Sequence, residues 1–219
     1  RAGWIPVHVL ARRADEVVGA APLYLKNNSY GEYIFDWGWA DAYQCAGGSY
    51  YPKLQSAVPF IPATGRRLLV CPGAPTSLAN ALASGMVQLA ARLGVSSVHV
   101  TFPTEAEWRD LGKAGYLLRL GRQFHWENRG YNTFDDFLAE LSSRKRKAIK
   151  KERRLVAEQG VTLKTLTGSD LREQHWDAFY EYYSDTIGRK WGRPYLTRDF
   201  FSILGETMSK LAVLIIAEQ

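Results

Sequence analysis

The chain has 219 residues, 46% of them hydrophobic and 13% aromatic, which is enough apolar surface for a sizeable core and excludes a disordered chain. No apolar run reaches the roughly 18 residues that a membrane-spanning helix needs. Two cysteines, Cys45 and Cys71, are too few for a disulfide framework, and no Cys/His cluster has the spacing of a zinc site. We therefore expect a folded, reduced, cytoplasmic protein with no metal and no membrane span.

The first 60 residues favour strands and an aromatic loop. Residues 4–11 and 17–25 are β-rich runs on either side of a polar turn, which predicts a hairpin. Residues 30–51 are dominated by aromatic residues and glycines with interspersed carboxylates. Two interpretations stay open for this stretch, a pocket wall or a packed aromatic loop. Residues 57–61 read as a short apolar strand.

The next part of the chain alternates helices with strands. Apolar residues at helical spacing follow Thr76 and end at Gly94, which predicts one helix. Residues 104–107 form a capping box for a shorter helix. Residues 95–102 and 116–126 read as strands. This order predicts an α/β region with a mixed sheet.

We predict a single long helix over residues 133–160, and the expected architecture depends on it. Thr133 can cap its start and Gly160 can end it. Its apolar residues fall in one arc, expected to be buried between two lobes, and its basic residues fill the opposite side. The apolar arc consists of Phe134, Phe137, Leu138, Leu141, Ala148, Ile149, Leu155 and Val156.

The net charge of +6 is concentrated in this helix. Residues 144–154 hold eight Lys or Arg against one Glu, so the rest of the chain is close to neutral. The stripe is interpreted either as a solvated face or as a cradle for phosphate groups of a substrate, cofactor or nucleic acid. The candidate anion-binding residues on it are Arg144, Lys147, Lys151 and Arg154.

The end of the chain resembles its beginning. Residues 161–166 read as a strand, Ser169 and Thr197 can cap two helices, and residues 211–217 form an apolar run of strand length. That last run looks like the first arm of a hairpin, as residues 7–11 do near the start. We infer an internal repeat in which both copies are incomplete. Pairing between two copies of the chain, as a homodimer, is one way to complete the sheets.

The basic segment 141–152 resembles the element that begins the second half of Fem-type peptidoglycan aminoacyltransferases, which carry two tandem acetyltransferase-like (GNAT) domains. The likeness extends to residues 179–188 and to Phe200 and Phe201. Residues 37–43, 50–54, 59–69 and 123–126 are similar to FemAB-like bacterial proteins of unassigned activity.

The resemblance implies a GNAT-like acyl-CoA N-acyltransferase fold in tandem. Residues 1–130 are then a first domain that lacks its opening helices, residues 131–160 the connecting helix, and residues 161–219 the N-terminal part of a second domain. The implied function is direct N-acyl or aminoacyl transfer to an amine, of a small molecule or a cell-wall precursor. Acyl-CoA or aminoacyl-tRNA is the expected donor, and tRNA an expected partner.

That chemistry needs a proton acceptor, a polarised carbonyl and a site for the donor's phosphates. Candidate proton acceptors are Asp36, Asp41 and His125, each with a structural role as its alternative. Residues 58–61 stand where a splayed GNAT strand is expected, although the usual glycine-spaced loop is absent after them. The candidate donor-binding residues are Thr64, Gly65, Arg66 and Arg67, and the candidate substrate-binding residues are Tyr43, Tyr50, Tyr51 and Lys53.

The rival interpretation comes from another class of protein. In it the chain is a non-catalytic GNAT-like module that binds tRNA, a nucleotide or pyrophosphate through the basic helix. Aromatic residues do not interleave with the basic run as stacking platforms for nucleic acid require, and no named nucleic-acid motif is present.

Overall fold

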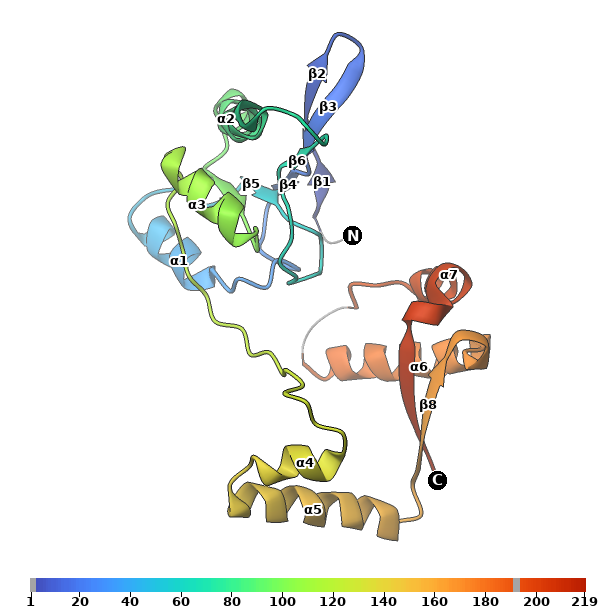
Figure 1. Cartoon of the computed structure of the whole chain (residues 1–219). Helices are drawn as coiled ribbons and strands as arrows, with labels where there is room; N and C mark the ends of the chain where they lie inside the picture. The colour runs from blue at the N-terminus through green and yellow to red at the C-terminus, as the bar shows by residue number, and fades with distance from the viewer. Residues whose placement is uncertain (1–2, 191–193) are drawn as a thin grey trace. The chain divides into compact units, whose positions relative to one another are not determined.

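The computed structural model describes residues 3–190 and 194–219 (Figure 1). The chain forms two compact units, Arg1–Gln123 and Phe124–Gln219. Helices and strands occur in both units, and the first contains a mixed sheet, so the predicted mixed α/β class is confirmed.

The first unit is built on a sheet in the order β1 (Ile5–Pro6), β4 (Tyr24–Lys26), β5 (Lys53–Ser56) and β7 (Val98–Val100). β5 pairs antiparallel with β4 and parallel with β7. Because side chains alternate along a strand, Leu54 enters the hydrophobic core while Lys53 lies on the other face of the sheet.

A second sheet in this unit contains the predicted hairpin. β2 (Val9–Arg13) pairs antiparallel with β3 (Glu16–Ala21), and β3 pairs with β6 (Leu69–Val70). Gly19 sits where the chain passes close to its neighbours, since an added Cβ would lie 3.1 Å from the Leu69 carbonyl oxygen. This close approach explains a glycine within the strand.

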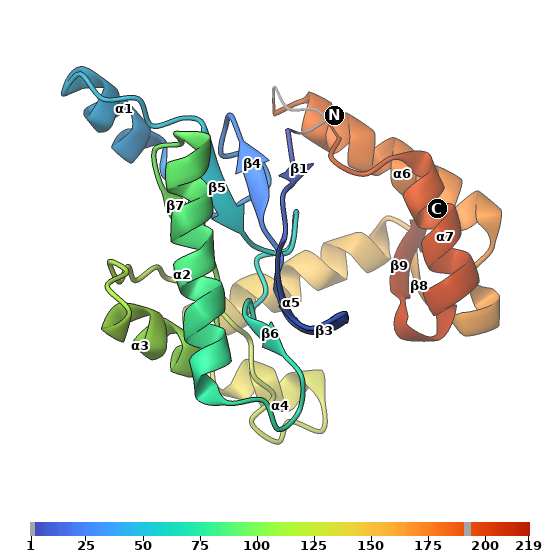
Figure 2. The same cartoon turned by 90° about the horizontal axis from the view of Figure 1, so that it is seen from above.

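Helix α2 (Thr76–Leu93) packs against this hairpin and supplies much of the core. Figure 2 shows it running along the sheets of the first unit. Its apolar side is buried at helical spacing, and it ends at Gly94 with φ of 64°, as the sequence predicts. The core residues that it contributes are Leu82, Ala83, Met86 and Ala90.

Two further helices belong to the first unit. Helix α3 (Glu105–Lys113) starts at the predicted capping box, in which Thr104 and Glu107 exchange bonds. Helix α1 (Trp37–Cys45) lies inside the aromatic stretch 30–51, for which the sequence predicted a pocket wall or a loop. The helix was missed because bulky aromatics and Gly38 have modest helix propensity.

Two predicted strands of this unit are wrong. Residues 58–60 are in a turn, with Phe60 at φ of 62°, because Pro59 and Pro62 remove backbone donors that a strand would use. The splayed strand expected at 58–61 is therefore absent there. Residues 116–126 contain no regular element.

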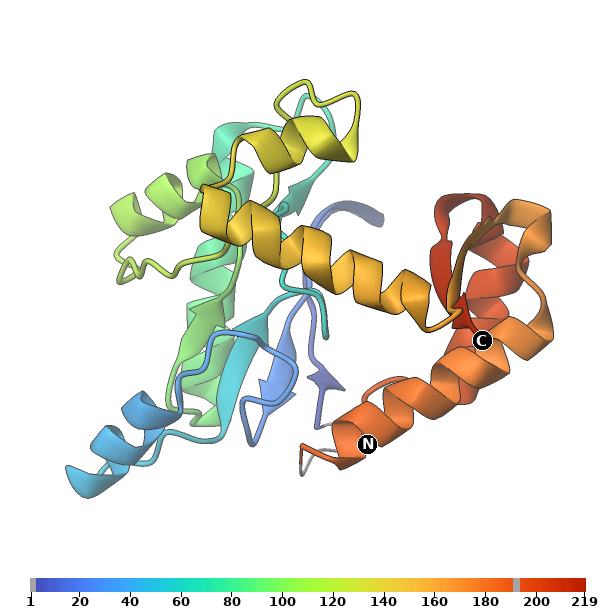
Figure 3. The same ribbon diagram turned by 90° about the horizontal axis from the view of Figure 1, so that it is seen from below.

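The long helix predicted over residues 133–160 is also wrong, because the chain forms two helices, α4 (Phe134–Ala139) and α5 (Ser143–Glu158). They lie side by side (Figure 3). The Arg146 guanidinium donates to the carbonyl oxygens of Leu138 and Leu141, each at 3.0 Å, and thereby caps the end of α4. Ser142 is extended, with φ of −56° and ψ of 150°, and precedes the new helix.

The ends of the predicted segment are correct and its middle is not. Thr133 forms a capping box with Asp136, and Gly160 has φ of 73°. Of the expected inward arc, Leu138 is buried, whereas Leu155 and Val156 are 44% and 40% exposed. The predicted arc is therefore divided between two helices and is only partly buried.

The rest of the second unit is an antiparallel strand pair beside two helices (Figure 2). β8 (Thr162–Thr167) pairs along its length with β9 (Val213–Glu218), so the last strand is paired within the chain. α6 (Glu173–Gly188) and α7 (Arg198–Met208) are joined by an aromatic cluster of Trp176, Phe179, Tyr183 and Phe201. A short 3-10 turn, Gly168–Asp170, follows the end of β8, and another, Ser209–Leu211, precedes the start of β9.

Candidate functional site

The most concentrated chemistry of the first unit surrounds the ammonium of Lys53. Its Nζ lies 2.8 Å from Glu32 Oε2, 2.8 Å from Asp36 Oδ2 and 2.9 Å from Ser29 Oγ. The side chains of Lys53, Glu32 and Asp36 are completely buried. We call these four residues the Lys53 cluster. Burying two carboxylates and one ammonium costs desolvation free energy. The contacts between the ammonium and the carboxylates must offset that cost.

A strained loop holds the two carboxylates in place. Tyr33 and Phe35 have φ of 57° and 48°, a left-handed conformation that aromatic residues rarely adopt. Glu32 and Asp36 beside them point inward, whereas Tyr33 is 39% and Phe35 77% exposed. Each such residue costs of the order of 1–3 kcal/mol, which the surrounding contacts must offset.

Burial and hydrogen bonding shift the pKa values of the two carboxyl groups in opposite directions. Burial raises the pKa of Glu32, and its contacts with Lys53 only partly counter this. Burial also acts to raise the pKa of Asp36, but hydrogen bonds from Lys53 and neighbouring hydroxyls outweigh it and lower the pKa to about 2. Glu32 is therefore the better proton acceptor, and Asp36 the more persistent anion.

A second lysine lies on the same face of the sheet, since Lys26 pairs with Lys53 across β4 and β5. Its Nζ donates to the Tyr30 carbonyl oxygen at 2.9 Å and lies 4.0 Å above the Trp4 ring. Burial lowers the pKa of Lys26 to about 8, with Glu32 opposing and Lys53 reinforcing the shift.

Tyrosine side chains complete the polar surroundings. Tyr50 donates its hydroxyl hydrogen to Asp36 Oδ2 at 2.6 Å, and the hydroxyls of Tyr51 and Ser29 are 2.7 Å apart. The Tyr50 ring packs edge-on against His99. Burial lowers the pKa of His99 to about 4, so this imidazole is neutral at pH 7.

Several buried acceptors near the cluster have no hydrogen-bond partner among the described residues. They include Glu32 Oε1 and Asp36 Oδ1, one oxygen of each carboxylate. Gln55 Oε1, on the same face of β5 as Lys53, is a third. Carboxylate and amide oxygens accept hydrogen bonds and do not donate them, so these atoms suit a donor such as a protonated amine.

The structure brings together four of the residues that the sequence singled out: Asp36, Tyr50, Tyr51 and Lys53. Asp41 and Tyr43 lie on the exposed side of α1, with Tyr43 against the Tyr50 ring. His125 belongs to the other unit. The residues that sequence reasoning missed are Lys26, Ser29, Glu32 and His99; no local pattern marks them, because the loop that gathers them is irregular.

The predicted donor-binding loop has an inward-pointing arginine. Arg67 is buried, and its guanidinium donates to the carbonyl oxygens of Thr101 at 3.0 Å and Ala63 at 2.7 Å. Glu107 accepts from the backbone nitrogens of Arg67 and Leu68. These bonds give Arg67 a structural role, while Thr64 and Arg66 are exposed and Gly65 half-buried.

In the second unit, α5 divides its basic residues between two tasks. At about 100° per residue, the predicted anion-binding residues Arg144, Lys147, Lys151 and Arg154 fall within an arc of about 80°. All four are exposed, and Arg154 pairs with Glu158 at 3.3 Å. Other basic side chains of α5 turn to α4 instead, which the sequence did not predict.

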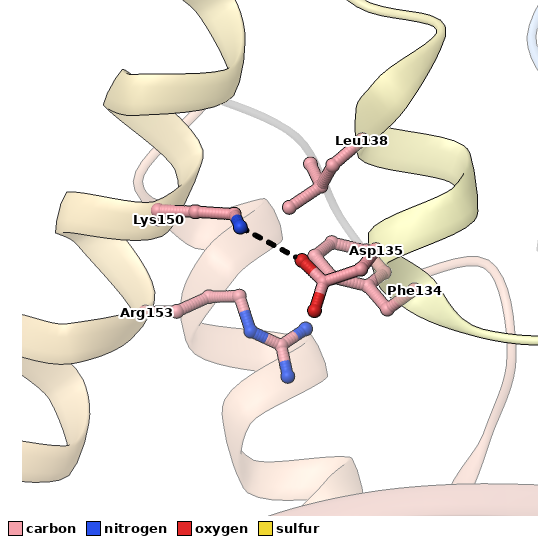
Figure 4. A pocket seen from close by; sticks show the side chains of 5 residues that line it. All are labelled: Phe134, Asp135, Leu138, Lys150 and Arg153. Atoms are coloured by element: carbon pink, nitrogen blue, oxygen red, sulfur yellow. Dashed lines mark ion pairs between the residues drawn. The ribbon is translucent and has the colours of Figure 1, made fainter.

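The contact between α4 and α5 leaves a hollow of about 370 Å³ (Figure 4). Lys150 pairs with Asp135 at 2.9 Å, and the Arg153 guanidinium lies 4.2 Å above the Phe134 ring. Leu138 forms the apolar floor. A neighbouring hollow of about 410 Å³, lined mainly by aromatic rings, shares Phe134 with it.

Within the described ranges, no three His, Cys, Asp or Glu side chains are grouped so that they could hold a metal ion. None of the helices in the same ranges has the length and apolar character needed to cross a membrane.

Comparison with known proteins gives one match. No curated protein and no solved structure matches the chain, so the GNAT-like fold and the tandem repeat stay predictions. A family model described as FemAB-like, peptidoglycan biosynthesis/recognition, matches residues 1–219. Because this match spans the whole chain, the protein belongs to the FemAB-like family.

Proposed function

We propose that the protein transfers an acyl or aminoacyl group directly to an amine of a peptidoglycan precursor. The family match supports the peptidoglycan connection. The observation that carries the proposed chemistry is the Lys53 cluster, in which two adjacent carboxylates each retain one oxygen without a partner among the described residues. A substrate amine would satisfy these oxygens.

The two carboxyl groups would have different tasks in such a transfer. Asp36, with its lowered pKa, would stay charged and hold the incoming ammonium, and Glu32, with its raised pKa, would take the proton from it. This assignment moves the proton-acceptor role from Asp36 to Glu32. Asp41 and His125 have no part in it.

The reaction balances without an added oxidant or metal. The amine nitrogen attacks the acyl carbonyl carbon, a C–N bond forms, and the C–S bond of an acyl-CoA or the C–O bond of an aminoacyl-tRNA breaks. Glu32 takes one proton from the ammonium before the attack. The second proton that the nitrogen loses as the amide forms goes to the departing sulfur or oxygen, so the donor leaves as a thiol or a hydroxyl. Thr64 and Arg66 are the exposed residues left to contact the phosphates of the donor.

Access requires the loop to move. Glu32 and Asp36 are 2% and 0% exposed, so in the proposed reaction an amine reaches them only after the loop that carries them opens. The strain at Tyr33 and Phe35 lowers the free energy needed for that opening.

The test is a transfer assay on the purified chain. A peptidoglycan stem peptide with a free side-chain amine is incubated with acetyl-CoA or aminoacyl-tRNA, and the product is detected by mass spectrometry. Replacing Glu32→Gln is expected to lower kcat by roughly 10²-fold or more, because a general base is lost. The matched control is Glu16→Gln, an exposed carboxylate on β3. The proposal is wrong if neither donor yields product, or if the folded Glu32→Gln protein is as active as the control.

A second function is favoured by one specific observation, the basic face of α5. Arg144, Lys147, Lys151 and Arg154 are exposed on a single side of the helix. We propose as the alternative that the chain is a non-catalytic module that binds tRNA, a nucleotide or pyrophosphate there. Because Fem-type enzymes use aminoacyl-tRNA, tRNA binding alone does not exclude transfer; absence of transfer together with tRNA binding would favour this alternative.

A further inference from the structure

The hollow of about 410 Å³ at the start of the second unit has walls made mainly of aromatic rings and no charged side chain among its lining residues. Its volume is that of a small-ligand site. All of its lining residues belong to the second unit. They are Trp126, Asn128, Tyr131, Asn132, Thr133, Phe134 and Phe137. A ligand in this hollow would therefore meet ring faces first.

Three of the rings can act on one ligand together. The centroid of the Trp126 ring lies 6.3 Å from that of Tyr131 and 6.2 Å from that of Phe137, and the Tyr131 and Phe137 centroids are 5.8 Å apart. The Phe137 ring stands at 74° to Trp126 and at 70° to Tyr131, so the rings form a corner and not a parallel slot. One cation can lie within about 6 Å of all three centroids, the range over which a ring face attracts a cation.

The fourth ring, Phe134, already serves a cation of the chain itself. The Arg153 guanidinium lies 4.2 Å from its centroid, on the side of the neighbouring hollow between α4 and α5 (Figure 4). This contact leaves Trp126, Tyr131 and Phe137 as the rings that a ligand can use.

The segment that carries the hollow is acidic, in contrast to α5. Residues 126–140 hold four carboxylates against one guanidinium, a net charge of −3. Asp136 Oδ2 accepts hydrogen bonds from the backbone nitrogens of Asn132 at 3.0 Å and Thr133 at 2.8 Å, two residues that line the hollow. The bonds from Thr133 and Asn132 lower the pKa of Asp136, which keeps a negative charge beside the rings. Ring faces and a nearby carboxylate both favour a cation.

The hydrogen-bonding groups inside the hollow are largely engaged within the chain. Asn128 Oδ1 accepts from the backbone nitrogens of Gly130 and Tyr131, and Thr133 Oγ1 accepts from that of Asp136. A primary ammonium brings three donors that would lose their water here without gaining acceptors. A quaternary ammonium has no N–H group and is weakly hydrated, so the hollow suits it better.

We propose that this hollow binds the trimethylammonium group of a small solute, of the kind that choline and glycine betaine carry. The methyl groups, which share the positive charge, contact the rings of Trp126, Tyr131 and Phe137, and Asp136 supplies a counter-charge. The site goes beyond the proposed acyl transfer and does not depend on it.

The test is an NMR titration of the ¹⁵N-labelled chain with choline and with 3,3-dimethyl-1-butanol, the neutral compound in which carbon replaces the nitrogen. The two have nearly the same shape and differ in charge. The indole signal of Trp126 is assigned from its loss in Trp126→Phe, and ammonium chloride controls for ionic strength. We expect choline to shift this signal and to bind about fivefold or more tightly than the neutral compound, the size of one exposed cation–π contact.

Variants that keep apolar bulk but remove a ring face test the rings directly. In Trp126→Leu and Tyr131→Leu, followed through the backbone amide of Gly130, the preference for choline should shrink, with circular dichroism confirming the fold. The matched control is Trp39→Leu, which removes an exposed tryptophan of the first unit and should keep the preference.

Three results would overturn the proposal. The first is no shift of the Trp126 signal with choline, and the second is equal binding of choline and the neutral compound by the unmodified chain, a comparison that needs no variant. The third is a response to phosphatidylcholine vesicles without a response to choline, which would assign the rings to a lipid surface instead of a small solute.

Discussion

Lys53 is the counter-charge for two buried carboxylates at once, so its removal should be far more damaging than the loss of a surface ion pair. We expect Lys53→Met to lower the free energy of unfolding by about 3–5 kcal/mol, because Glu32 and Asp36 would be left buried without a cation. Urea unfolding followed by circular dichroism measures this change. Lys113→Met, which breaks the exposed pair with Asp110, should leave the free energy nearly unchanged.

Asp36 should make the free energy of unfolding depend on pH over a defined acidic range. Its pKa falls from 3.8 to about 2 on folding, so the unfolded chain binds a proton first as the pH drops. The stabilisation is present above about pH 4 and is lost as the pH falls towards 2, amounting to about 2 kcal/mol. In Asp36→Asn the acid loss of stability over this window should be smaller by that amount, measured by thermal unfolding at a series of pH values. If Asp36→Asn loses as much stability between about pH 4 and pH 2 as the unmodified chain, the lowered pKa of Asp36 is contradicted.

The sequence could identify some members of the Lys53 cluster but not the cluster itself. Asp36, Tyr50 and Lys53 stood out because carboxylates and rings are dense around them. Glu32 did not, since its inward direction is set by two left-handed residues that follow it, Tyr33 and Phe35. No periodicity encodes such a loop, and long-range contacts decide it.

At the scale of elements, the joint between α4 and α5 depends on one side chain. We expect Arg146→Gln to destabilise the second unit by about 1 kcal/mol, because the carbonyl oxygens of Leu138 and Leu141 lose their donor. Hydrogen exchange should quicken at residues 139–142. Lys147→Gln, one residue later and turned to solvent, is the matched control and should not change these rates.

The basic face of α5 can be tested as an anion-binding element. Replacing Lys147, Lys151 and Arg154 by Gln should weaken tRNA or pyrophosphate binding, and for tRNA should reduce the slope of log K against log salt by up to about 2. Binding is measured by fluorescence anisotropy at several salt concentrations. The same charge is removed in the control by replacing Arg92, Arg109 and Lys113 in the first unit. Equal affinity of the two triple variants at one salt concentration would count against the stripe as a site.

Helix ends were easier to predict than helix continuity. Thr133, Gly160 and the Thr104 capping box act through neighbours within four residues, and the structure has them as predicted. The break at Ser142 depends on Arg146 reaching back eight residues to Leu138, which a pattern of apolar positions does not reveal. Apolar periodicity continued across the break, and so it predicted one helix where there are two.

At the scale of the whole molecule, the division into two units predicts where proteases cut. Residues 116–132 contain no regular element, and Leu117, Leu120 and Phe124 are 95%, 88% and 91% exposed. Brief digestion with chymotrypsin should therefore cleave first between residues 117 and 126 and release two fragments, identified by mass spectrometry. First cleavage inside α2 or α6 would contradict this division.

The left-handed pair Tyr33 and Phe35 sets a limit on how this protein can be engineered. Glycine fits such a backbone without steric penalty, so Tyr33→Gly would relax the chain there. The same change would also remove strain that favours the proposed opening of the loop, so opening would require more free energy. At this loop, thermal stability and ease of opening therefore oppose each other, and a substitution that raises one lowers the other.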